Sequence, residues 1–143
     1  ENGLECRNPF AGVYLPNDME SKSRHPISNR NLEKLQQECL LIDDDVRWLV
    51  ALISDTGLRL SEAVGLMVED LVLEGDTPYL DLKPRNHRRL KTANSERSVP
   101  LVGMSLWAAT RIAKREETPF CFPRYANFEG CKVDGGFGGF SNR

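Results

Sequence analysis

An arginine and a glutamate three positions apart form the first group of residues that could do chemistry. Arg59 and Glu62 follow the pair Thr56-Gly57, and both stand off the apolar face of the helix expected to begin near Leu58. Residues three apart on a helix can touch each other. A guanidinium beside the free N–H groups of a helix N-terminus makes a site for an anion such as phosphate. A solvated Arg–Glu pair with no further role would have the same spacing.

The second group is a run of basic residues between positions 83 and 97, which we call the basic hairpin. It holds six cations against one acid, Glu96, a local balance of +5 in a chain whose net charge is −2. The cations are Lys83, Arg85, Arg88, Arg89, Lys91 and Arg97. Such a concentration predicts salt-dependent binding to a polyanion. The alternative is a solvated, charged loop.

The elements that must position these two groups are helices followed by short strands. Apolar residues recur at helical spacing in three successive segments, the third of which runs to Met67, and alternate at strand spacing further on. Helices are expected to begin near positions 28, 44 and 58 and to include 104–112, and strands to cover 79–83 and 97–101. The pattern predicts an α+β fold, mostly α-helical with a small antiparallel β-sheet.

The length of 143 residues suits one domain, with irregular segments at both ends. Residues 1–27 carry three prolines and no periodicity, which predicts a linker. Residues 28–123 hold the periodic elements. Residues 124–143 include five glycines between positions 130 and 140, and we expect a Gly-rich loop or frayed tail there.

Composition argues against several classes of protein. No apolar run reaches the length of a membrane helix. The four cysteines form no C-x-x-C pair, so free thiols in a cytoplasmic protein are expected. With only two histidines, no metal site is predicted. The glycine-rich stretch does not match G-x-G-x-x-G, so no dinucleotide cofactor is expected either.

Two segments resemble motifs of one family. The segment TGLRLSEAVGL, from Thr56 to Leu66, resembles the first arginine box of the tyrosine recombinases, the phage-integrase family. The segment KTANSERSVPL, from Lys91 to Leu101, resembles that family's lysine-bearing β-hairpin, and the order and separation of the two also fit. Asn8-Pro9-Phe10 resembles the junction after the family's upstream DNA-clamping domain. The resemblance spans the chain from about Pro26 to Pro123.

The resemblance implies an enzyme that cleaves and rejoins double-stranded DNA through a 3′-phosphotyrosine link, without metal or cofactor. Arg59 would bind the attacked phosphate in bidentate fashion, Lys91 would protonate the leaving 5′-oxygen, and Glu62 would support Arg59. The residues expected to contact DNA are His87, Arg88, Arg89, Thr92 and Arg97. The parent would act in the cytoplasm, bacterial or phage-encoded, as a tetramer on DNA that integrates or recombines a mobile element.

Part of the family's pattern is missing from this chain. Neither His25 nor His87 is followed by arginine at the third position, so there is no H-x-x-R box. The tyrosines are Tyr14, Tyr79 and Tyr125, and none follows the place of that box. We therefore expect residues 28–123 to be a partial catalytic domain, inactive alone. Its partners would be the missing N- and C-terminal parts of the same protein, with residues 1–27 leading from the upstream domain.

Two other functions fit the same residues. Residues 44–66 read as helix, turn and helix, which would suit a non-catalytic DNA-binding module of helix-turn-helix type with Arg59 facing DNA. An interaction domain with a charged loop is the plainer alternative. Salt-independent behaviour towards DNA would favour this last function.

Overall fold

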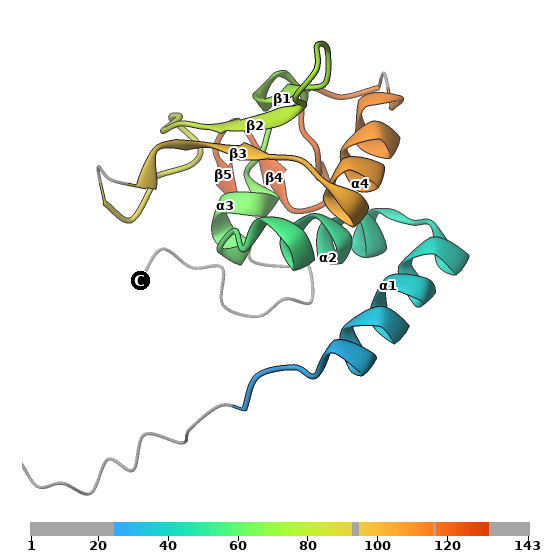
Figure 1. Ribbon diagram of the computed structural model, residues 1–143. Coiled ribbons are helices and arrows are strands. Elements are labelled where there is room, and N and C mark those ends of the chain that lie inside the picture. Colours follow the sequence, from blue (N-terminus) through green and yellow to red (C-terminus); the bar gives the residue numbers. More distant parts are fainter. Residues whose placement is uncertain (1–24, 93–94, 116, 132–143) are drawn as a thin grey trace, which may run out of the picture.

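The computed structural model describes residues 25–92, 95–115 and 117–131, and within them it confirms the α+β class (Figure 1). The helices are α1 (Asn29–Ile42), α2 (Asp45–Thr56), α3 (Leu60–Val64) and α4 (Gly103–Ala113), with a 3₁₀ turn, η1 (Val68–Asp70). The strands are β1 (Leu71–Val72), β2 (Tyr79–Leu82), β3 (Arg97–Pro100), β4 (Ala126–Asn127) and β5 (Gly130–Cys131).

The first two helices begin and end at residues with clear local signals. Ser28 caps α1, and the Asp44 carboxylate caps α2 by accepting a hydrogen bond from the Arg47 N–H at 2.9 Å. Gly57 ends α2 in the left-handed conformation, with φ of 62°, which glycine adopts without a Cβ clash. Both helix starts expected from the sequence are confirmed.

The third helix is shorter than its apolar pattern predicts. It was expected to run from Leu58 to Met67, but it covers only Leu60–Val64. The backbone beyond it pairs with a distant segment instead: the Cys121 N–H donates to the Leu66 carbonyl at 2.9 Å, and the Val68 N–H donates to the Pro119 carbonyl at 2.8 Å. These bonds take up polar groups that a longer helix would have used internally.

Three antiparallel strands in the order β1-β2-β3 form the main sheet. Leu80 and Leu82 of β2 are buried, and Leu80 lies opposite Val99 of β3. The two-residue strand β1 gave no periodic signal in the sequence. The hairpin β4–β5 is also new, because it lies in the segment expected to be loop or frayed tail; residues 132–143 of that segment are outside the described residues.

The core lies between the sheet and the pair α2 and α4, which pack against each other (Figure 1). Its largest buried side chains include Leu49, Leu52, Ile112, Phe122 and Tyr125. The helix α1 extends away from this body and has Cys39 as its one buried residue. No helix in the described ranges is both long and apolar enough to cross a bilayer.

Candidate functional site

The candidate site begins at Arg59, which stands at the N-terminal end of α3. Its backbone N–H donates to Glu62 Oε2 at 3.0 Å, and its Nη1 donates to Glu62 Oε1 at 2.6 Å. One carboxylate therefore holds both the backbone and the guanidinium of Arg59. The Glu62 side chain is 3% exposed, whereas that of Arg59 is 53% exposed. The pair predicted from the spacing thus forms, with its acid inside the fold and its cation at the surface.

A second arginine reaches the same carboxylate from the sheet. Arg97, the first residue of β3, donates from Nη2 to Glu62 Oε2 at 3.2 Å. Burial opposes ionisation of Glu62, but the hydrogen bonds from Arg59 and Arg97 outweigh it and lower the pKa of this carboxyl. Two guanidinium groups around one carboxylate leave the cluster with a net positive charge at neutral pH.

Ser95 joins the hairpin to Arg59, and sequence reasoning did not single it out as a site residue. Its buried hydroxyl lies 3.5 Å from Arg59 Nη1 and 2.9 Å from the Thr92 hydroxyl. Its carbonyl accepts from Arg97 Nη1 at 2.7 Å. The only signal in the sequence was its position three residues after Thr92, the spacing of a tight turn. The structure thus brings Arg59, Glu62, Thr92 and Arg97 into one cluster.

Arg89 and Lys91 lie on the exposed part of the basic hairpin. Among the described residues neither of them forms an ion pair, and no hydrogen bond joins Lys91 to Arg59. The structure therefore places Lys91 next to Thr92 of the cluster in the chain, with its side chain outside the hydrogen bonds of the cluster.

His87 and Arg88 are placed inside the fold. Arg88 has a side chain that is 1% exposed and donates to Asp70 Oδ2 at 2.9 Å. The His87 ring nitrogen Nε2 lies 3.0 Å from the Gly65 carbonyl, and the ring packs edge-on against Phe120. As whole residues, Arg88 is 2% exposed and His87 9% exposed, and both side chains form hydrogen bonds inside the fold, so neither offers the surface that the expected DNA contact would need.

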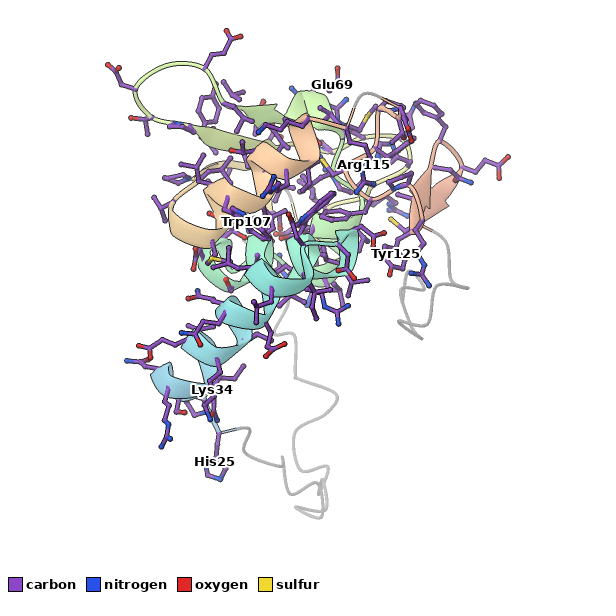
Figure 2. The ribbon with its side chains drawn as sticks, turned by 90° about the vertical axis from the view of Figure 1, so that its right-hand side faces the viewer. His25, Lys34, Glu69, Trp107, Arg115 and Tyr125 are labelled. Carbon is purple, nitrogen blue, oxygen red and sulfur yellow. The ribbon has the colours of Figure 1, made fainter. Side chains whose placement is uncertain are left out.

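Neighbouring acids also offset much of the positive charge of the hairpin. Lys83 pairs with Asp81 at 3.1 Å, and Arg85 pairs with both Asp70 and Glu69. In Figure 2, Glu69 lies at the top of the molecule and His25, which precedes α1, lies at the bottom. In the described residues no three His, Cys, Asp or Glu side chains are grouped to hold a metal ion.

Comparisons of this chain with models of protein families, with curated proteins and with solved structures found no match.

Proposed function

We propose that this chain is part of the catalytic domain of an enzyme that cleaves and rejoins DNA strands, of the tyrosine-recombinase type, in which Arg59 binds the attacked phosphate. The observation that supports this most is that only one of the three nitrogens of the Arg59 guanidinium donates hydrogen bonds within the described residues. Nη1 is held by Glu62 and lies near Ser95, while Nε and Nη2 donate to no acceptor in the described part of the chain. Nε and Nη2 form one edge of the guanidinium, which can grip two phosphate oxygens at once.

The charge of the cluster suits that task. A phosphate under attack gathers negative charge on its non-bridging oxygens, and a fixed guanidinium stabilises that charge without reorganisation. Glu62 fixes the direction of Arg59, and Arg97 keeps Glu62 from cancelling the whole charge. Lys91, exposed on the hairpin, is proposed to protonate the leaving 5′-oxygen.

The rest of the proposal concerns DNA and the remaining polypeptide. Arg89 and Thr92 are proposed to contact the DNA backbone, since phosphate contacts position a protein without reading sequence. Arg97 was expected to do the same, but its guanidinium is paired with Glu62, and we propose that it supports the cluster instead. The tyrosine nucleophile and an H-x-x-R box would come from further parts of the same protein. The complete enzyme would work in the cytoplasm as a tetramer on double-stranded DNA, without cofactor.

The helix-turn-helix alternative is less well supported. A recognition helix lies in the major groove and offers several exposed side chains to base edges. The helix α3 has five residues, and Glu62, Ala63 and Val64 are buried. Little of its surface is left to read bases.

The test uses the protein encoded by the reading frame that holds this chain, continued past Arg143. We expect an H-x-x-R box and a later tyrosine in that frame, and a covalent adduct between the protein and a nicked DNA substrate. Arg59→Ala should lower the rate of adduct formation about a hundredfold or more, while DNA affinity changes little.

Arg47→Ala is the matched control, because Arg47 also pairs with an acid three positions away, Asp44, but lies on α2 outside the cluster. It should leave the rate unchanged. A frame without the box and tyrosine, or an adduct that forms equally fast in Arg59→Ala, would overturn the proposal. Loss of DNA binding in Arg59→Ala, with no cleavage by either protein, would favour the DNA-binding module.

A further inference from the structure

Arg88 is a buried cation that the proposed chemistry does not use. Its Nη1 donates to the Gly65 carbonyl at 3.1 Å and to Asp70 Oδ2 at 2.9 Å, and its Nη2 donates to the Lys83 carbonyl at 2.6 Å. Gly65 follows the last residue of α3, and Lys83 follows the last residue of β2. One side chain of the basic hairpin therefore joins the end of the helix to the end of the strand.

Asp70 is the acid that makes this arrangement stable in the interior. It is fully buried, and its Oδ2 accepts from the Met67 N–H at 3.0 Å as well as from Arg88. Its Oδ1 accepts from Arg85 Nε at 3.0 Å. A buried charge is tolerated only when it is paired and hydrogen-bonded, and both oxygens of Asp70 meet that condition.

Gly65 leaves the space that Arg88 occupies. A Cβ at this position would come within 2.9 Å of Arg88 Cδ. The backbone of Gly65 has φ of −85°, which any residue can adopt. The reason for glycine here is therefore the close approach of the arginine, not the conformation of the chain.

The hairpin is thus fixed to α3 at two places. Arg88 binds it to the residue after the helix, and Arg97 binds it to Glu62 within the helix. Arg89, Lys91 and Thr92 lie between these two anchors, on residues 83–92, which extend from β2 beyond the sheet and away from α4 (Figure 1). Arg59 stands at the start of the same helix.

We propose that Arg88 and Asp70 are positioning residues, which fix the hairpin segment carrying Lys91 in a set place relative to Arg59. The mechanical part of this inference stands on the contacts alone. Its consequence for catalysis, that Lys91 is held where a leaving oxygen would be, rests on the proposed function. The experiment therefore reads the two parts separately.

The first readout is amide hydrogen exchange on the full 143-residue chain. Arg88→Met removes the guanidinium at similar length. Exchange of the amides in 86–92 should rise about tenfold more than exchange in α2, which reports global opening. Arg85→Met is the matched control, because Arg85 also pairs with Asp70 but its side chain binds neither the Gly65 nor the Lys83 carbonyl. It should leave the ratio of exchange in 86–92 to exchange in α2 within about twofold.

A second variant keeps the test decisive if Arg88→Met does not fold. Gly65→Ala retains both charges and pushes on the Arg88 side chain. It should raise exchange in 86–92 relative to α2 in the same direction, by a smaller factor. An equal rise in 86–92 and in α2 for the variant that folds would overturn the inference, because it would show a general loss of stability.

The second readout is cleavage by the longer protein. Arg88→Lys keeps the positive charge but loses the two separate guanidinium nitrogens that bind the Gly65 and Lys83 carbonyls. It should lower the maximal rate of adduct formation severalfold, with little change in the DNA concentration that gives the half-maximal rate. Faster amide exchange in 86–92 of the variant, with no adduct formed by the longer protein, would leave the positioning inference intact and reject the proposed function. Faster amide exchange in 86–92 together with an unchanged maximal rate of adduct formation in Arg88→Lys would overturn the inferred consequence for catalysis.

Discussion

Glu62 controls how much of the charge on Arg59 is available at the surface. Its carboxylate accepts from two guanidinium groups and one backbone N–H, and all three bonds come to a side chain that is nearly enclosed. Hydrogen bonds to an ionised group are stronger than neutral ones. The arginines themselves reach solvent, which screens part of this gain. Glu62 is therefore best regarded as the residue that orients the cluster and contributes moderately to stability.

This leads to a prediction for Glu62→Gln. Folding lowers the pKa of Glu62 from its ordinary value of 4.5. The ionised carboxylate therefore stabilises the fold fully above pH 4.5, and this stabilisation is lost as the pH falls through the lower pKa of the folded state. The variant should cost about 1 kcal/mol of unfolding free energy at pH 7 and less at pH 3. Urea denaturation at both pH values measures this.

Glu33→Gln serves as the control, since Glu33 lies exposed on α1 and should change the unfolding free energy little at either pH. An equal cost of Glu62→Gln at both pH values would show that the charge of Glu62 is not what its two arginines require.

At the scale of elements, α4 depends on an acid from another helix. No side chain at Val102 caps α4; instead Asp55 Oδ2, near the end of α2, accepts from the Met104 N–H at 2.7 Å and from the Ser105 N–H at 3.1 Å. A carboxylate is favourable at a helix N-terminus. The contact fixes the start of α4 against the end of α2.

Asp55→Ala should therefore destabilise the protein by about 1–2 kcal/mol, since it removes the acceptor for two free N–H groups of α4. Asp55→Asn should recover most of the loss, because its amide oxygen can still accept. The midpoint of urea unfolding distinguishes these outcomes. A neutral effect of alanine would contradict the proposed cap, and so would asparagine being as destabilising as alanine.

At the scale of the whole molecule, the distribution of charge differs from its count along the chain. The basic hairpin has six cations in sequence, yet acids from four other positions lie beside four of them. Those acids are Glu62, Glu69, Asp70 and Asp81. Within the hairpin, Arg89 and Lys91 are the two described cations that stay exposed and outside any ion pair.

The salt dependence of DNA binding should show this. Each phosphate neutralised contributes about −0.9 to the slope of log affinity against log salt, so the two open hairpin cations predict a slope of about −2, whereas all six hairpin cations would give about −5. Titration of a short duplex at several salt concentrations measures the slope. Lys91→Ala should reduce it by about 1. A slope of about −5 would mean that the paired cations leave their acids and bind phosphates as well. A slope near zero would favour an interaction domain.

The starts of α1 and α2 and the strands β2 and β3 could be predicted because their signals are local. Ser28, Asp44 and Gly57 act within one turn of themselves, and alternation in β2 reflects the two faces of a strand. The same local spacing predicted that Arg59 and Glu62 would meet. The basic hairpin could be predicted from the run of cations in the sequence, because counting charges requires no knowledge of tertiary contacts.

The division of that hairpin into buried and exposed cations was beyond local patterns. Arg88 and Arg89 are neighbours of the same type, yet Arg88 is enclosed and Arg89 is exposed. The difference comes from Asp70 and Gly65, which lie 18 and 23 positions away in the sequence. The early end of α3 likewise follows from pairing with residues around Phe120. Local hydrogen bonds are encoded by neighbours in the chain, whereas burial depends on which distant groups the fold brings to pair with a charge.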